Sequence, residues 1–368
     1  MGKQRKIAIQ TIEGRDSYAI FKARADVDRI VGECGYAPLV LGSRSPVGIV
    51  RVLKRHYDIC SLRFRLTADD TVFLQFPWIH NNKPAFYSNL FGSGARVDCI
   101  IHDLDSLRGI ERNDNNELAD LARCHSIIAH TPAMKKFLMN CGIDGDKIKT
   151  LNLFPYLTSD KVHELPDSVH ELPDGVREQP DGACGVADGA CGVADSVQEQ
   201  PDGDIPTVVF AGNLTKSPFV NRLHEIATDG LRFNLYGNGA EHFAGSDYVK
   251  YCGAFAPDHP GTIDGNWGLV WDGGELDTCT GLYGEYLRYN SSHKASMCLA
   301  LGIPVVLWEE SSLKDFVTER NLGIAVRSLR DLPAAIGGLS AGQFSAIRRS
   351  ARAFAAELRT GDILRRLI

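Results

Sequence analysis

The sequence predicts an α/β protein built from two doubly wound domains, and three observations support this fold class. Strand-like apolar runs alternate with helical patterns in both halves of the chain, which is typical of βαβ units around a parallel sheet. A repeat rich in proline and glycine separates the two halves. The chain has 368 residues, of which 44% are hydrophobic, and this is enough for two cores rather than one.

The first half contains five strand-like runs with helical patterns between them. These runs read KIAIQTI, APLVLG, TVFLQFP, ARVDCIIHD and SIIAHT. We expect helices over residues 18–34 and 115–123, and a third that begins at Pro132. The second half shows the same alternation, and its strand-like runs read TVVFAGN, LRFNLYGNG, VKYCGAF, WGLVWDG and GIPVVLW. One or two further helices are expected at the C-terminal end.

A seven-residue repeat runs from Val162 to Gly203, and six copies of it can be counted directly. Each copy contains glycine, proline or both, so the repeat cannot form a coiled-coil helix. It is acidic and lacks aromatic residues, which predicts a disordered or loosely turned insert, because such a segment buries too little apolar surface to offset its conformational entropy. The predicted divisions are an N-terminal domain over 1–158, the insert over 159–205, a C-terminal domain over 206–350 and a C-terminal helix over 351–368.

Composition and charge exclude several classes of function. The formal net charge is −6, so nothing global attracts the molecule to nucleic acid. The ten cysteines are scattered singly without a CxxC pair, which favours a reducing, cytoplasmic location. No apolar stretch reaches the roughly 18 residues of a membrane-spanning helix. A substrate linked to lipid at the inner face of the membrane stays open, and so does a homo-oligomer.

Two glycine-containing turns follow strands of the second half. VVFAGNLTK ends in Gly212, Asn213 and Lys216, which offer close backbone approach, a donor with an acceptor, and a point charge for phosphate. An ordinary turn with a solvated lysine explains the same residues equally well. The turn with Gly237 and Gly239 lacks the third glycine of a dinucleotide fingerprint, so we expect a tight strand-to-helix turn there.

The segment YLRYNSSHKASMCLALG places a cation where a helix favours anions. Ser291 or Ser292 is a candidate N-cap, and His293 with Lys294 then falls in the first turn. The helix dipole disfavours a lysine at that end. A bound anion removes the conflict, since free backbone N–H groups and Lys294 would converge on phosphate. The alternative is a surface lysine beside a histidine that only caps or packs.

The segment IIHDLDSLR places two carboxylates after a strand. Asp103 and Asp105 could hold a divalent cation on a sugar diphosphate, because hard cations prefer carboxylate oxygen. Asp103 could instead take a proton from an acceptor hydroxyl, or simply cap a helix. The loop after the first strand carries Gly14, Asp16 and Ser17, and in a doubly wound domain it overhangs the ligand cleft. Gly14 and Ser17 are therefore candidate ligand-binding residues.

Seven segments occur in an order that resembles bacterial β-1,6-galactofuranosyltransferases and, more distantly, the streptococcal glucosyltransferase that extends N-acetylglucosamine on serine-rich adhesins. They read FLQFPWIH, IIHDLDSLR, FAGNLTKSPFV, LYGNG, YCGAFAPD, GLVWDG and YLRYNSSHKASMCLALGIPVVLWEES. The most specific piece is YNSSHK followed by ALGIPV. The resemblance spans nearly the whole chain apart from the insert.

This resemblance implies a GT-B architecture, in which two Rossmann-like domains face a cleft and the C-terminal domain holds a UDP-sugar. Donor contacts are implied for Gly212, Asn213 and Lys216. Where adhesin-modifying relatives have arginine after the Gly-Asn turn, this chain has a lysine, which cannot make the same bidentate phosphate contact. The residues implied at the diphosphate and ribose are Tyr289, Asn290, His293 and Lys294, with Glu309 or Glu310 reaching the ribose hydroxyls.

The implied activity is transfer of a hexose, galactofuranose by this resemblance, from a UDP-sugar to a cell-surface glycan or lipid-linked acceptor. No metal is expected, because protein cations and a helix N-terminus stabilise the leaving diphosphate in this architecture. Inversion requires one base opposite the leaving group, with Asp103 as the first candidate and Asp16 as the second. The alternative is a catalytically silent nucleotide-sugar-binding partner of another transferase. Peripheral contact with a membrane stays open.

Overall fold

The computed structural model describes most of both halves of the chain. The described residues are 4–11, 19–109, 116–158, 205–228, 230–240, 243, 245–260 and 263–368. The predicted heptad insert lies outside the described residues, and so does the loop with Gly14, Asp16 and Ser17.

The N-terminal half forms a six-stranded sheet in the order β2-β1-β3-β4-β5-β6, and every neighbouring pair is parallel. Its strands are β1 (Lys6–Thr11), β2 (Ala37–Leu41), β3 (Thr71–Phe76), β4 (Arg96–Ile101), β5 (Ser126–Ala129) and β6 (Ile148–Thr150). Its helices are α1 (Ala19–Glu33), α2 (Gly48–Arg65), α3 (Lys83–Gly92), α4 (Glu117–Ala122) and α5 (Pro132–Asn140).

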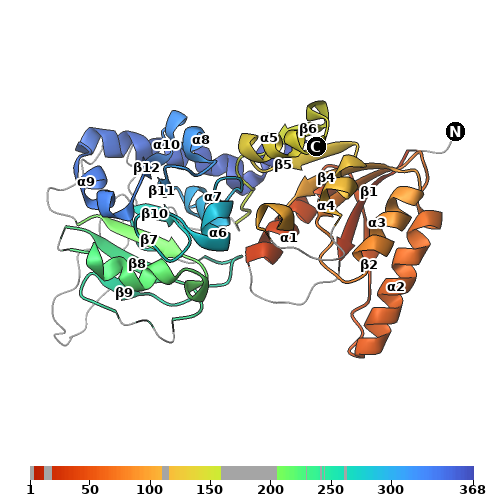
Figure 1. Ribbon diagram of the computed structural model, residues 1–368, viewed down its shortest axis with the longest axis horizontal. Coiled ribbons are helices and arrows are strands. Elements are labelled where there is room, and N and C mark those ends of the chain that lie inside the picture. Colours follow the sequence, from red (N-terminus) through yellow and green to blue (C-terminus); the bar gives the residue numbers. More distant parts are fainter. Residues whose placement is uncertain are drawn as a thin grey trace, which may run out of the picture.

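The C-terminal half forms a second parallel sheet in the order β12-β11-β10-β7-β8-β9. Its strands are β7 (Thr207–Ala211), β8 (Arg232–Tyr236), β9 (Val249–Tyr251), β10 (Trp267–Val270), β11 (Val305–Trp308) and β12 (Gly323–Val326). Its helices are α6 (Gly281–Tyr286), α7 (His293–Ala300), α8 (Lys314–Glu319), α9 (Leu332–Gly337), α10 (Ala341–Thr360) and α11 (Asp362–Arg365). Figure 1 shows the two sheets, each with its helices, as neighbouring units.

These two sheets confirm the predicted pair of doubly wound α/β domains. Each strand-like run named from the sequence forms a strand, and the helices expected near 18–34, near 115–123 and from Pro132 are α1, α4 and α5. The sequence did not indicate α2, α3, β6 or β12. In the first sheet the strand order reverses between β1 and β3, and in the second between β7 and β10. Ligands of doubly wound sheets bind beyond the carboxyl ends of the strands at such reversals.

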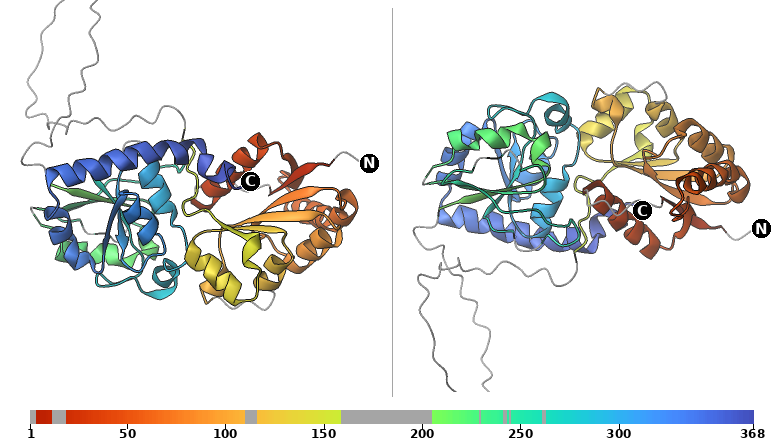
Figure 2. Two further views of the ribbon diagram at one scale, coloured as in Figure 1. Left: turned by 90° about the horizontal axis from the view of Figure 1, so that it is seen from above. Right: turned by 90° about the horizontal axis from the view of Figure 1, so that it is seen from below.

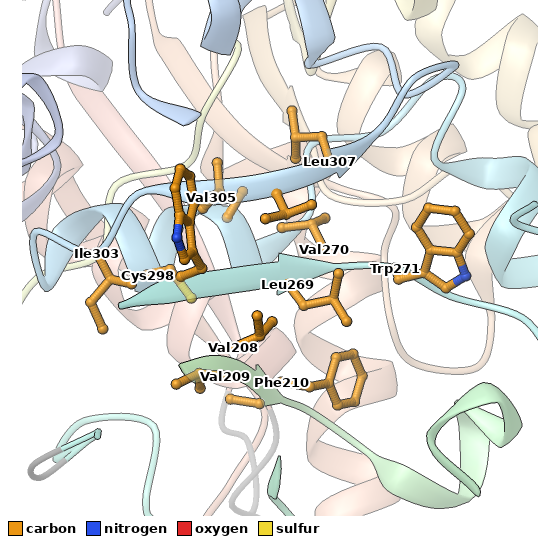
Figure 3. Close-up of a cluster of buried hydrophobic side chains, with 14 of the residues drawn as sticks. Val208, Val209, Phe210, Leu269, Val270, Trp271, Cys298, Ile303, Val305 and Leu307 are labelled. Atoms are coloured by element: carbon orange, nitrogen blue, oxygen red, sulfur yellow. The ribbon is translucent and has the colours of Figure 1, made fainter. Parts of the chain in front are cut away.

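The core of the second sheet fixes the position of α7. Buried side chains of β7, β10 and β11 pack together beside this helix, as Figure 3 shows. Gly268 of β10 leaves room for the helix, because a Cβ there would lie 2.4 Å from Sγ of Cys298. Helix α7 therefore packs closely against β10, one of the two strands at which the order reverses.

The C-terminal helices begin earlier than predicted and return to the N-terminal half. Helix α10 starts at Ala341, so the predicted boundary between 350 and 351 is wrong, since it falls inside a continuous helix. The missed signal is a capping box, in which Ser340 and Gln343 each satisfy the other's backbone N–H. After α10, the short helix α11 places Leu364 in the core cluster of α1. Figure 2 shows α10 running along the C-terminal half and the chain ending beside the N-terminal half.

None of the helices in the described part of the chain is long and apolar enough to cross a membrane.

We predict that Gly361→Ala destabilises the protein by about 1–2 kcal/mol, because Gly361 has a φ of +81° that an alanine adopts only with strain. Its Cβ would also lie 2.4 Å from Cδ1 of Ile30. The check is urea unfolding followed by circular dichroism. Gly342→Ala is the control, since a Cβ at that position of α10 meets nothing within 4 Å. Equal stability of the two variants would contradict the prediction.

Candidate functional site

Lys294 lies at the point where the strand order of the second sheet reverses. Helix α7 begins at His293 with Ser292 as its N-cap residue. The Lys294 Nζ donates to Oδ2 of Asp272, 2.6 Å away, and lies 5.2 Å from the ring centroid of Phe210. Asp272 follows β10, and its Oδ1 accepts a hydrogen bond of 3.1 Å from Oγ of Ser217. The lysine is therefore anchored between the ends of β7 and β10.

Asp272 supplies the negative charge that the sequence indicated should come from a bound anion. Its carboxylate neutralises Lys294 in the first turn of α7, so the dipole conflict does not by itself require an external ligand. Sequence reasoning missed Asp272 as a site residue. The available signal was a carboxylate directly after a buried strand in WGLVWDG.

The turn after β7 brings Gly212 against the lysine side chain. A Cβ on Gly212 would lie 3.1 Å from Cε of Lys294, so a larger residue would push the lysine away. Asn213 accepts a hydrogen bond of 3.1 Å from the backbone N–H of Lys216 through its side-chain oxygen, which closes the turn. Nζ of Lys216 lies 5.4 Å from the ring centroid of Tyr283. Gly212 and Lys294 are thus in contact, while Asn213 and Lys216 shape the turn beside them.

The glycine turn after β8 packs directly against the turn after β7. Gly237 has a φ of +135°, and a Cβ there would lie 1.7 Å from the carbonyl oxygen of Gly212. Gly239 has a φ of +92°, and its Cβ would lie 2.1 Å from Oγ1 of Thr215. Only glycine fits both positions. The predicted tight turn after this strand is confirmed, but among the described residues no helix follows it before β9, so the expectation of a strand-to-helix turn is wrong in that part.

Three histidines from both halves surround the buried ring of Phe154, which follows β6. The ring centroids of His102 and His130 each lie 5.1 Å from that of Phe154, and the centroid of His293 lies 4.9 Å from it. Burial lowers the pKa of His130 to about 3 and that of His293 to about 4, and it lowers the pKa of His102 well below its usual value. All three imidazoles are therefore neutral at pH 7.

The segment before α7 forms hydrogen bonds with the N-terminal half. Nε2 of His130 donates to the carbonyl of Ile101 at 2.8 Å, so Nδ1 accepts the backbone N–H of Ser291 at 3.0 Å. The hydroxyl of Thr131 donates to the carbonyl of Tyr289 at 2.7 Å. The ring of Tyr289 also lies against Phe137 of α5, with centroids 6.1 Å apart. Tyr289 thus lies at the contact between the two halves.

Two buried polar atoms beside the start of α7 have no partner within the described residues. They are Oδ1 of Asn290 and Oγ of Ser291. A buried polar atom without a hydrogen bond costs roughly 1–3 kcal/mol, so a ligand that supplies donors there would recover that free energy. Lys294 follows within four residues, so the unpaired atoms and the ammonium group belong to one region.

Asp103 follows β4 and is paired with Arg108. The Nη2 atom of Arg108 lies 2.7 Å from Oδ1 of Asp103, and the guanidinium lies 4.9 Å from the ring centroid of Tyr286 in α6. Burial raises the pKa of Asp103 to about 6, although the charges of Arg108 and Arg24 oppose the shift. A carboxylate with this pKa is ionised at pH 7 and still takes up a proton readily.

The neighbouring Asp105 has a different cationic partner from that of Asp103. Its Oδ2 lies 4.0 Å from Nζ of Lys83, and its backbone N–H donates to Glu117. Among the residues that the structure describes, no group of three or more histidine, cysteine, aspartate or glutamate side chains is arranged to hold a metal ion.

The two glutamates after β11 have different surroundings. Glu310 forms an ion pair with Arg288, whose guanidinium lies 4.5 Å from the ring centroid of Trp308. Glu309 is exposed, and its backbone N–H donates to the carbonyl of Val326 at 2.8 Å. Both glutamates are exposed, but only Glu310 is paired with an arginine. Glu309 is held at the end of β11 through its backbone, which leaves its carboxylate accessible to a ligand.

The two parallel sheets and the contacts between their carboxyl ends define the GT-B class of glycosyltransferases. Two solved structures share this fold with the chain. Alr3699/HepE from Anabaena, in complex with UDP-glucose, is 11% identical with a TM-score of 0.53, and the match covers 98% of this chain and 99% of that one. The lipopolysaccharide outer core galactosyltransferase WaaB is 11% identical with a TM-score of 0.54, covering 99% and 100%.

The chain belongs to the glucosyltransferase 3-like family, whose N-terminal domain matches residues 6–153 and whose C-terminal domain matches residues 208–368. The β-1,6-galactofuranosyltransferase WbbI of Escherichia coli K12 is 29% identical over 273 residues, which is 73% of this chain and 69% of that protein. Glucosyltransferase 3 of Streptococcus gordonii is 29% identical over 124 residues, about a third of each chain. The resemblance inferred from the seven sequence segments is confirmed.

We predict that His130→Gln weakens the dependence of stability on pH. The pKa of His130 is about 3 in the folded protein, whereas an unfolded histidine has a pKa of about 6.5. The unfolded state therefore binds more protons between these values, and stability falls as pH decreases from 6.5, by up to about 1.4 kcal/mol per pH unit. In the variant, the free energy of unfolding, measured by urea unfolding, should therefore fall less steeply between pH 6.5 and pH 4. His125→Gln, at an exposed histidine before β5, is the control, and equal slopes for both variants would contradict the assignment.

Proposed function

We propose that the chain is a UDP-sugar-dependent hexosyltransferase that transfers galactofuranose, with inversion, to a cell-surface glycan or a lipid-linked acceptor. The observation that carries the proposal is Lys294, held by Asp272 against Gly212 at the strand-order reversal of the C-terminal sheet. This is where doubly wound sheets bind nucleotides. The similarity to WbbI supports galactofuranose as the sugar.

The donor diphosphate is proposed to bind at the N-terminal end of α7. The ammonium group of Lys294 has three N–H donors, and the bond to Asp272 uses one of them. The others can reach phosphate oxygens while Asp272 keeps the side chain oriented. The first backbone N–H groups of α7 add partial positive charge as the UDP leaves. Because these donors are in place before the sugar bond breaks, little reorganisation is needed.

Further donor contacts are proposed for residues around this position. Gly212 allows the backbone to approach the ligand, and Asn290 can use its unpaired Oδ1 to accept from a ribose or sugar hydroxyl. Glu309 is the candidate for the ribose hydroxyls, since Glu310 is engaged by Arg288. The other proposed donor contacts are Gly14, Ser17, Asn213, Lys216, Tyr289 and His293.

Asp103 is the proposed general base. With a pKa of about 6 it is ionised at neutral pH, and it takes the proton of the acceptor hydroxyl as that oxygen attacks the anomeric carbon. Arg108 orients the carboxylate. Attack from the face opposite the departing UDP inverts the anomeric centre. No metal takes part in this proposal, because Lys294 and the helix end carry the charge of the leaving group.

The test is a donor panel. Purified protein is given UDP-galactofuranose, UDP-galactose or UDP-glucose with a panel of hexose-terminated acceptors, with and without EDTA, and the product linkage is determined by NMR. We expect turnover with UDP-galactofuranose, a β-linked product and no effect of EDTA. Activity that EDTA abolishes and manganese restores would overturn the metal-free site. UDP binding without transfer or hydrolysis of any donor would favour the silent binding partner instead.

We predict that Lys294→Met weakens UDP binding at least tenfold, because a hydrogen bond to a charged group contributes roughly 1.5–3 kcal/mol. Isothermal titration calorimetry with UDP measures the effect, and circular dichroism confirms that the fold persists. Lys250→Met is the matched control, since Lys250 is an exposed lysine of β9 in the same domain. Wild-type affinity in Lys294→Met would remove this lysine from the donor site.

We predict that kcat/KM falls below about pH 6, where Asp103 becomes protonated. Asp103→Asn should lose roughly 10²–10⁴-fold in turnover while UDP binding persists. Arg108 lowers the pKa of Asp103, so Arg108→Gln should raise that pKa and move the acid limb to higher pH. Arg96→Gln, at an ion pair with Asp98 in β4, is the control for charge loss. An acid limb that stays in place in Arg108→Gln would argue against Asp103 as the titrating base.

A further inference from the structure

Helix α2 carries an apolar stripe that faces solvent instead of the core. Ile49, Leu53, Tyr57 and Phe64 are between 62% and 85% exposed. Their spacing of four, four and seven residues places them on one face of the helix. The residues that α2 buries are Asp58, Ile59 and Leu62, which lie on the opposite face. The apolar stripe therefore lies on the outer face of the helix, and no other part of the described chain covers that face.

Basic side chains flank this stripe. The helix sequence GIVRVLKRHYDICSLRFR contains five arginine or lysine residues and one acidic residue. The acidic residue, Asp58, is buried and forms ion pairs with Lys54 and Arg65. Lys54 and Arg63 border the stripe from its two sides at this helical spacing, and Nζ of Lys54 lies 5.6 Å from the ring centroid of Tyr57 in the stripe. A chain with a net charge of −6 thus concentrates positive charge along one exposed helix.

The position of α2 leaves the stripe accessible. The helix packs on α3 at the outer edge of the N-terminal half, next to the edge strand β2. In Figure 1 its N-terminal end, at the lower right, extends beyond the other labelled elements of that half. The first turns are exposed on nearly all sides, from Val47 through Lys54. A flat surface can therefore approach the helix without meeting the rest of the protein first.

We propose that this face of α2 docks onto the surface of an anionic phospholipid bilayer. A helix with an apolar stripe and basic flanks lies in the plane of a membrane interface, where its apolar residues enter the acyl boundary and its cations meet the headgroups. Lys54 and Arg63 supply these cations from the two sides of the stripe. The inference goes beyond the proposed function, since lipid binding needs neither the donor site nor Asp103.

The charge of the flanks favours a lipid surface over a second copy of the chain. In a two-fold symmetric contact through α2, each basic flank would lie near the same flank of its partner. Like charges in such a contact repel and destabilise it. An anionic bilayer instead complements both the cations and the stripe.

The test uses the full chain and vesicle co-sedimentation. Vesicles of phosphatidylcholine with about a third phosphatidylglycerol are compared with vesicles of phosphatidylcholine alone. We expect binding to the anionic vesicles, weaker binding at high salt because the headgroup attraction is screened, and little binding to the neutral vesicles. Equal binding to both kinds of vesicle, or to neither, would overturn the proposal.

Two double variants test the two parts of the surface. Leu53→Asp with Phe64→Asp should reduce partitioning at least about tenfold, since each buried apolar side chain contributes that much or more. Lys54→Gln with Arg63→Glu should also reduce it at least about tenfold, because each unit of positive charge removed lowers partitioning about fivefold. The controls are Met139→Asp on α5, an exposed apolar position, and Arg349→Glu on α10, an exposed basic position. Thermal unfolding confirms that each variant folds.

Two further results would overturn the proposal. The first is unchanged vesicle binding in both double variants. The second is a dimer of the wild-type chain in light scattering that Leu53→Asp with Phe64→Asp converts to a monomer, without binding of the wild type to anionic vesicles. That result would assign α2 to contact between two copies.

Discussion

The hydrogen bond between the backbone N–H of Ser291 and Nδ1 of His130 is the constraint on which the site depends. It forms only with a neutral imidazole whose Nε2 carries the proton, and the carbonyl of Ile101 selects that tautomer. Burial keeps the imidazole neutral by lowering its pKa. Because Ser291 lies just before the N-cap residue of α7, this contact and that of Thr131 with Tyr289 connect the carboxyl edge of the first sheet to the helix that carries Lys294.

The ion pair of Lys294 and Asp272 joins the first turn of the same helix to the end of β10. Both side chains are largely buried, so removing either charge would leave the other without its partner in a poorly solvated place. The pair is oriented further by Ser217, which donates to the second carboxylate oxygen. The network is thus built by the chain itself, and a ligand joins it through donors that are already in place. This is the arrangement in which fixed dipoles stabilise developing charge most effectively.

The local sequence pattern was sufficient to predict where the strands lie, but it could not predict which side chains meet at the ends of neighbouring strands. Runs such as TVVFAGN and GIPVVLW are short, apolar and bounded by turn residues, which is enough to place β7 and β11. Asp272 was missed because its partner lies 22 positions away, and their contact depends on β10 lying beside β7. The dipole argument correctly required an anion near Lys294 but could not say that the chain provides one.

The same limit applies to the pairing of His130 with Ser291, which is 161 positions away. Helix α2 was missed for a different reason. Its most regular apolar spacing faces solvent, so the usual link between periodicity and burial does not hold there. The start of α10 was available in principle, since Ser340 and Gln343 form a capping box that the sequence displays.

Residues 156–157 and the C-terminal end of α10 lie together where the two halves meet. Tyr156 is already bound to the C-terminal half, since its N–H donates to the carbonyl of Leu358 and its hydroxyl to that of Pro257, while Leu157 donates to Asp26 of α1. The return crossing at Gly361 follows the same part of α10. Both connections therefore lie at the same end of α10. The contacts of Tyr156 and Leu157 thus join the two halves before the heptad repeats begin in the sequence, and none of these contacts involves a residue of the repeats.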